Sequence, residues 1–183
     1  QAGVDAPSVA GLRKAGAVIL GKAHQDEFAY FTLGFSGRTV LVSNPYNTQE
    51  SSAGSSSGSG AALASNFAIG GTGSDTCQSI RHPSSVSGLV GIRPSIGVVS
   101  RKGIFPLSHI RDTGGPMTRS VRDSALMLTA MASIDPVDDP DTTLFKAEDR
   151  PDTYLRFLDR DTHGVKGKKI GVVRQLGTNS TPA

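Results

Sequence analysis

The sequence contains one cysteine, Cys77, no tryptophan, and only 5% aromatic residues among its 183 residues. A single cysteine cannot form a disulfide within the chain, so cysteine usage leaves the cellular compartment undecided. The four histidines lack the paired spacing of a zinc site, and we expect neither a metal nor another cofactor. No apolar run approaches the roughly 20 residues that cross a bilayer, so we expect no membrane-spanning segment. A cytoplasmic location is favoured, while a secreted one stays open.

Charge of one sign is also scarce. The chain has 19 basic and 16 acidic residues and a formal net charge of +3. The basic cluster Lys166 to Lys169 has no interleaved aromatic residues, which indicates a solvated edge and no nucleic-acid partner. The acidic run Asp135 to Asp141 lacks the glycine and the distal glutamate of an EF-hand, so we interpret it as a loop without calcium.

Glycine and proline are frequent, with 22 and 10 residues, and predict a large loop fraction. Between the loops, apolar periodicity predicts helices alternating with short buried strands, which favours an α/β fold with a mostly buried sheet. The expected elements are a helix over 6–15, a strand over 17–20, a loop over 31–50, a helix from 61 leading into a strand over 68–73, a strand over 88–93, a turn over 112–116, a helix over 121–131 and a strand over 170–173.

Two serine-bearing loops are the most informative feature of the chain. The first runs from Gly54 to Gly60 and the second from Ser74 to Pro83. Gly/Ser runs are more often flexible connectors. Here, however, the small-residue segment Ala61 to Gly70 lies between them and is typical of a packed helix running into a buried strand. Two such loops can hold a serine nucleophile. Alternatively, the first loop forms an anion-binding nest in a phosphate or nucleotide module, although it lacks the Gly-Lys-Ser/Thr of a P-loop.

The two loops resemble the amidase signature family of amide hydrolases. That family combines a Gly-Ser-Ser-Gly-type loop with a later Asp-Thr-Gly-Gly-Ser-Ile-Arg-x-Pro segment. The resemblance extends from about Pro7 to Arg174 and includes Gly16 to Phe28, Gly88 to Pro94, Gly103 to Ser108 and Asp112 to Asp123. It implies a large α/β domain with a mixed central sheet flanked by helices.

The resemblance also implies a role for each site residue. Ser79 corresponds to the nucleophile, and Ser55, reached through a cis peptide, corresponds to the serine that relays its proton. The backbone N–H groups of the turn Thr76, Cys77 and Gln78, ending at Ser79 itself, correspond to the oxyanion hole. Asp75 and Arg81 are expected to pair and hold this turn rigid, with further support from Ser56.

The sequence departs from the family pattern at Cys77 and Gln78, which replace two glycines. A glutamine in a left-handed conformation would cost roughly 1–2 kcal/mol, so Gln78 would weaken the oxyanion hole. We interpret Cys77 as a small buried filler.

A lysine activates the serine pair in the family, upstream of the segment that matches Gly16 to Lys22. The chain begins at Gln1, short of that position, and Lys22 belongs to a different family segment. We therefore expect residues 1–183 to be a partial amidase signature domain that lacks the catalytic-lysine region and the C-terminal part, and to be inactive in isolation.

The favoured hypothesis is an amide hydrolase that cleaves a linear small-molecule amide through a Ser-cisSer-Lys mechanism and an acyl-enzyme intermediate. One alternative is a catalytically inactive amidase-like remnant. Another is the transamidation subunit of a glutamyl-tRNA(Gln) amidotransferase. A homo-oligomer is the assembly we consider for any of these.

Overall fold

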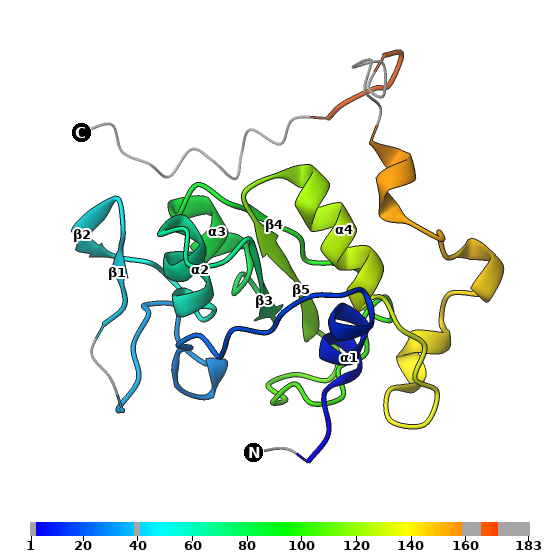
Figure 1. Ribbon diagram of the computed structural model, residues 1–183, viewed down its shortest axis with the longest axis horizontal. Coiled ribbons are helices and arrows are strands. Elements are labelled where there is room, and N and C mark those ends of the chain that lie inside the picture. Colours follow the sequence, from blue (N-terminus) through cyan, green and yellow to red (C-terminus); the bar gives the residue numbers. More distant parts are fainter. Residues whose placement is uncertain (1–2, 39–40, 159–165, 172–183) are drawn as a thin grey trace.

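The computed structural model describes residues 3–38, 41–158 and 166–171 (Figure 1). Helices and strands alternate along it, so the predicted α/β class is confirmed. The helices are α1 (Pro7–Lys14), α2 (Ser57–Ala64), α3 (Arg81–Val86) and α4 (Val121–Met131), with 3-10 turns η1 (Glu27–Ala29), η2 (Pro140–Thr143), η3 (Ala147–Asp149) and η4 (Tyr154–Phe157). The strands are β1 (Ser43–Asn44), β2 (Asn47–Ser51), β3 (Gly70–Asp75), β4 (Val90–Gly91) and β5 (Thr113–Thr118).

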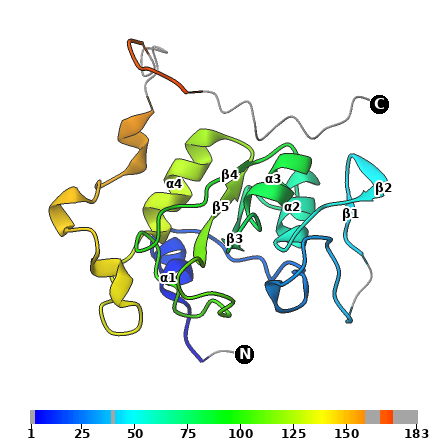
Figure 2. The ribbon, with the colours of Figure 1, turned by 180° about the vertical axis from the view of Figure 1, so that it is seen from behind.

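A small antiparallel sheet of order β3-β5-β4 lies in the middle of the molecule. Helices α2 and α3 lie to one side of it and α1 and α4 to the other, as the views from both sides show (Figures 1 and 2). Each side has its own apolar core. Leu12 of α1 packs with Val99, Leu128 and Met131, while Leu63 of α2 packs with Ile80 and Met117. The loops that carry the serines therefore start from an element held by a packed core.

The central strand β5 corrects the turn predicted over 112–116. Its sequence, Thr-Gly-Gly-Pro-Met-Thr, is typical of a turn, yet all six residues are buried between β3 and β4. A side chain at Gly115 would overlap the carbonyl oxygen of Ile92, so only glycine allows this close approach of neighbouring backbones. Tertiary packing overrides strand propensity here.

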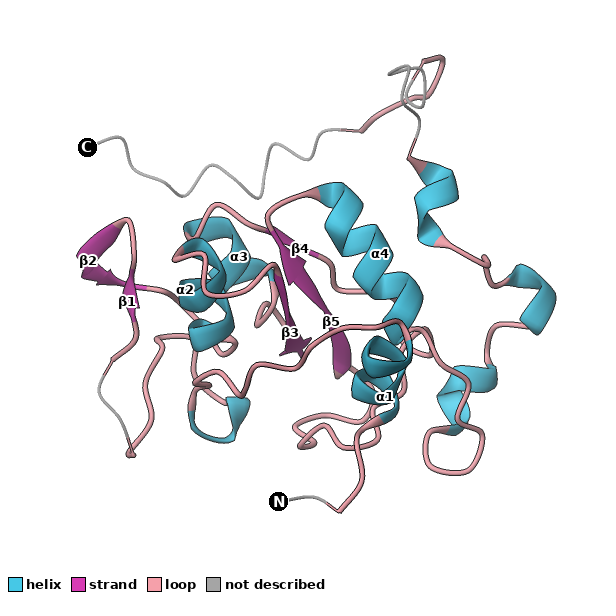
Figure 3. Cartoon of the chain, viewed as in Figure 1, coloured by secondary structure: helices cyan, strands magenta, loops and turns pink. Residues whose placement is uncertain are grey.

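Other predicted strands are shorter than expected or are loops. Residues 17–20 form no strand, because no strand of the described residues pairs with them and Val18 and Leu20 are mostly exposed. The strand predicted over 88–93 is reduced to β4. Within the loop predicted over 31–50, the β1–β2 hairpin begins at Ser43 (Figure 3). Ile170 and Gly171 are not in a strand, and residues 172–173 lie outside the described residues.

Helix α4 matches its predicted range, because its start signal is local. The Ser120 side chain accepts a hydrogen bond from the backbone N–H of Asp123 at 3.1 Å, as an N-cap residue does. Helix α1 also matches within a residue at each end, whereas α2 begins at Ser57, inside the first serine loop. None of the helices in the described part of the chain combines the length and apolarity needed to cross a membrane.

Candidate functional site

Ser55 lies in a buried turn between β2 and α2. The Gly54–Ser55 peptide bond is cis, as the resemblance implies. The Ser55 side chain is fully buried, and its hydroxyl has no hydrogen-bond partner among the described residues. The Ser55 carbonyl oxygen accepts a hydrogen bond from the backbone N–H of Asp26 at 3.0 Å. A Cβ at residue 54 would overlap the Asp26 carboxyl, which explains why glycine is required there.

Ser56 joins the two serine loops. Its backbone N–H donates to the carbonyl oxygen of Ser79 at 3.2 Å. Its hydroxyl lies between the backbone N–H of Ser74, at 3.3 Å, and the carbonyl oxygen of Ser74, at 3.4 Å. Ser79 is 6% exposed. The structure therefore brings the segments of Ser55 and Ser79 together, 24 residues apart in sequence, on either side of one backbone hydrogen bond.

The turn that precedes Ser79 presents unused backbone donors. Within the described residues, the N–H groups of Cys77, Gln78 and Ser79 donate to no acceptor. The following helix, α3, begins at Arg81. Free N–H groups on one tight turn are the donor type that an oxyanion needs. The predicted role of this turn stays a prediction, and its geometry is compatible with it.

Asp75 holds the turn from below, as predicted. Its carboxylate is fully buried and accepts hydrogen bonds from the Ile80 backbone N–H at 3.0 Å and from Arg81 Nε at 3.2 Å. Arg81 also donates to the Cys77 carbonyl oxygen. The sequence did not indicate Arg93, whose Nε lies 3.3 Å from Asp75 Oδ1. Two guanidinium groups thus offset the cost of burying the Asp75 charge.

Thr76 is held by Asp112, a second buried carboxylate that sequence reasoning missed. The Thr76 hydroxyl donates to Asp112 Oδ1 at 2.6 Å. The backbone N–H groups of Leu107 and Ser108 both donate to Asp112 Oδ2 at 2.7 Å. The register of β3 with β5, which pairs Asp75 with Thr113, places Asp112 beside Thr76. A sequence reading of residues 112–116 as a turn conceals this contact.

Cys77 and Gln78 differ from the expectations made from sequence. Cys77 is exposed, so its interpretation as a buried filler is wrong. Gln78 is absent from the non-glycine residues with positive φ among the described ones, so the expected left-handed strain does not occur. The turn accommodates both side chains because they point outward, where a glycine is not required.

The anion-nest alternative for the first loop loses its donors. The backbone N–H of Ser56 is used by Ser79, and that of Gly58 donates to the His24 carbonyl oxygen at 3.0 Å. A phosphate at this helix start would have to displace both bonds.

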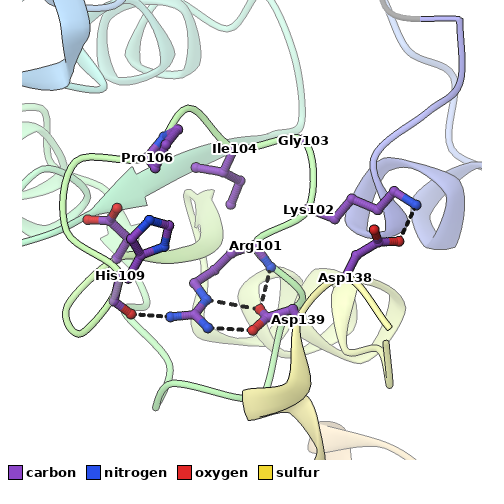
Figure 4. A pocket seen from close by; sticks show the side chains of 9 residues that line it. Arg101, Lys102, Gly103, Ile104, Pro106, His109, Asp138 and Asp139 are labelled. Atoms are coloured by element: carbon purple, nitrogen blue, oxygen red, sulfur yellow. Dashed lines mark hydrogen bonds and ion pairs between the residues drawn. The ribbon is translucent and has the colours of Figure 1, made fainter. Parts of the chain in front are cut away.

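A separate pocket lies behind the Thr76–Asp112 contact (Figure 4). Its cations are already paired. Arg101 binds Asp139 and the carbonyl oxygen of His109, and Lys102 binds Asp138. We therefore assign this pocket a structural role. Among the described residues, no three His, Cys, Asp or Glu side chains cluster as metal ligands.

Asp26 supports Ser55 and was not singled out from sequence. Its side chain is 2% exposed, its Oδ2 accepts the Leu33 backbone N–H at 3.0 Å, and its Oδ1 has no partner among the described residues. Burial raises the pKa of this carboxyl, although hydrogen bonds from backbone groups and Ser57 oppose the shift. Since the folded pKa is raised, ionisation costs stability as pH rises above the ordinary carboxyl range.

We expect Asp26→Asn to gain stability relative to the wild type as pH rises from 4 to 8. The amide keeps an acceptor for Leu33 but cannot ionise, so it escapes the desolvation cost that the carboxylate bears at neutral pH. Urea unfolding of both proteins at several pH values measures this. A stability difference that is the same at every pH would contradict the interpretation.

Comparison with known proteins adds to this geometry. The family model described as Amidase matches residues 1–183. A glutamyl-tRNA(Gln) amidotransferase subunit from Bdellovibrio bacteriovorus is 41% identical over 179 residues, covering 96% of this chain and 34% of that protein. A probable amidase of Arabidopsis thaliana is 40% identical over 175 residues, covering 92% of this chain and 33% of that protein.

Solved structures agree with the sequence comparison. The native peptide amidase of Stenotrophomonas maltophilia superposes with a TM-score of 0.75 at 45% identity, covering 78% of this chain and 30% of that one. The chain spans about a third of the length of the curated relatives it matches.

Proposed function

Because the chain belongs to the amidase signature family, we propose that the protein hydrolyses linear carbon-nitrogen amide bonds with Ser79 as nucleophile and Ser55 as proton relay. The observation that carries the proposal is the Ser56–Ser79 backbone bond, which joins the two serine loops beside a turn with unused N–H donors. Relatives named amidase and peptide amidase support the reaction class.

The proposed reaction follows from these positions. Ser79 Oγ attacks the amide carbonyl carbon while its proton passes to Ser55 Oγ, whose own proton passes to a base. The carbonyl π electrons move to the oxygen, and the free N–H groups of the turn stabilise the resulting anion. When the tetrahedral intermediate collapses, the carbon-nitrogen bond breaks, and the leaving nitrogen takes a proton back from Ser55. Water then attacks the ester on Ser79, which releases the carboxylic acid and restores the serine.

The base is the remaining requirement of the mechanism. A lysine takes this role in the family-type mechanism, and Lys22 is exposed, which does not suit a buried neutral amine. We place the lysine outside residues 1–183. The buried, unpartnered hydroxyl of Ser55 supports this, because an unsatisfied buried hydroxyl costs about 1–3 kcal/mol unless another group completes the site.

Covalent labelling tests the proposal without knowledge of the substrate. We expect a sulfonyl fluoride to modify Ser79 in the protein made from its complete coding sequence, with loss of fluoride, and mass spectrometry of peptides to locate the adduct. Ser79→Ala should remove the labelling. Ser59→Ala is the matched control, since Ser59 lies in the same serine-rich segment but donates to the Thr72 carbonyl oxygen at 2.9 Å. Absence of Ser79 modification would favour the inactive remnant.

The relatives named for a glutamyl-tRNA(Gln) amidotransferase favour a second candidate, in which the protein cleaves the side-chain amide of glutamine and passes on the ammonia within a complex. Both candidates use the same serines. Comparing ammonia release from glutamine and from simple primary amides separates them, because a transamidation subunit should prefer glutamine.

A further inference from the structure

Two aromatic rings at the edge of the serine site lie against each other while remaining exposed. The ring centroids of Phe28 in η1 and Phe105 in the loop 101–112 are 5.8 Å apart, with an angle of 48° between the planes. Their side chains are 66% and 62% exposed. Aromatic rings with open faces are common linings of binding sites for apolar ligands.

Phe28 is held in this position by the segment that supports Ser55. Its backbone is left-handed, with φ 55° and ψ 19°, and Ala29 has φ 55° as well. Such a conformation is unfavourable in a non-glycine residue and persists only where the surroundings enforce it. Here the Ala29 N–H donates to the Asp26 carbonyl oxygen at 2.9 Å, and the Asp26 N–H donates to the Ser55 carbonyl oxygen. Phe28 lies two residues from Asp26, which is at most about 7 Å of chain.

Phe105 is held by the segment that supports the turn before Ser79. It precedes by two residues Leu107, whose N–H donates to Asp112, and Asp112 accepts the Thr76 hydroxyl. The aromatic pair therefore connects the two halves of the proposed active site, one ring tied to the Ser55 side and the other to the oxyanion side. Such a position borders the place where a substrate carbonyl would bind.

We propose that Phe105, with Phe28 against it, is the apolar wall that receives the acyl group of the amide, so that the protein prefers amides of aromatic or bulky aliphatic acids. This inference rests on the proposed function. The acyl group is favoured over the amine because the turn Thr76 to Ser79 would hold the carbonyl oxygen, and Ser79 would keep the acyl group through the ester intermediate. A ring anchored to that turn is the neighbour of the acyl carbon.

The test compares Phe105→Ala with wild type, both made from the complete coding sequence, on acetamide, hexanamide and phenylacetamide. We expect the variant to lose about tenfold to a hundredfold in kcat/KM for the two larger amides, mainly through KM, and to change little on acetamide. Phe105→Leu should recover most of the loss on hexanamide. Phe67→Ala removes another exposed ring, 75% exposed, and should behave like the wild type.

Equal losses on all three amides would overturn the proposal, as would an effect confined to substrates that differ only in the amine. A binding measurement separates this proposal from the proposed function. Calorimetry with phenylacetate and acetate requires no turnover. Tighter binding of phenylacetate by wild type than by Phe105→Ala would support the apolar wall even if no amide were hydrolysed, and equal binding by both proteins would refute it.

Discussion

Replacing Ser79 by alanine is expected to lower kcat for amide hydrolysis about 10⁴- to 10⁶-fold, since the nucleophile that forms the acyl-enzyme is lost. Ser55→Ala should fall in the same range, because Ser79 would keep its proton without the relay. Neither change should disturb folding strongly, as the hydroxyl of Ser55 makes no hydrogen bond in the described residues. Thermal unfolding of each variant checks that activity is lost from a folded protein.

The double variant provides the decisive control. Residues that act as one unit are strongly non-additive, so Ser79→Ala with Ser55→Ala should be no worse than Ser79→Ala alone. Steady-state assays on a primary amide, with burst kinetics for the acyl-enzyme, measure this. If the two losses in kcat multiply, the serines act independently and the relay between them is wrong.

Asp139→Ala is expected to cost about 3–5 kcal/mol of unfolding free energy at pH 7, because it leaves the buried charge of Arg101 with too few partners. Arg101 is only 17% exposed and Asp139 2%. Arg101 donates to Asp139 Oδ2 from its backbone at 2.8 Å and from Nε at 2.9 Å, and to Asp141 at 2.6 Å. This network fastens the segment 135–141 to the loop that carries Phe105.

The pH dependence of that stability gives a second readout. Burial alone would raise the pKa of Asp139, but hydrogen bonds from Arg101 outweigh it and hold the pKa below its ordinary value. The stabilisation is therefore present above the ordinary carboxyl pKa and is lost as pH falls through the lowered one.

Urea unfolding of wild type and Asp139→Asn should accordingly differ at pH 7 and converge toward pH 3. The matched control is Lys102→Met, which breaks the exposed pair with Asp138 and should shift the unfolding midpoint little. A difference between wild type and Asp139→Asn that persists unchanged at pH 3 would contradict the ion-pair explanation.

Local signals in the sequence determined several elements and the two serine loops. Helix α4 matches because the Ser120 cap and the apolar spacing act within one or two turns. The pairing of Asp75 with Arg81 spans six residues and was predictable for the same reason. The order of the Gly54 to Gly60 and Ser74 to Pro83 segments was enough to identify the family.

Only the tertiary structure decided the contacts between segments distant in sequence. The strand β5 looks like a turn in sequence and becomes the centre of the sheet, because its glycines admit neighbouring backbones on both sides. Asp26 and Asp112 became recognisable as supports only once folding placed them beside Ser55 and Thr76. Hydrogen bonds within a turn depend on neighbouring residues, whereas burial and strand pairing depend on the whole chain, so the first can be read from sequence and the second cannot.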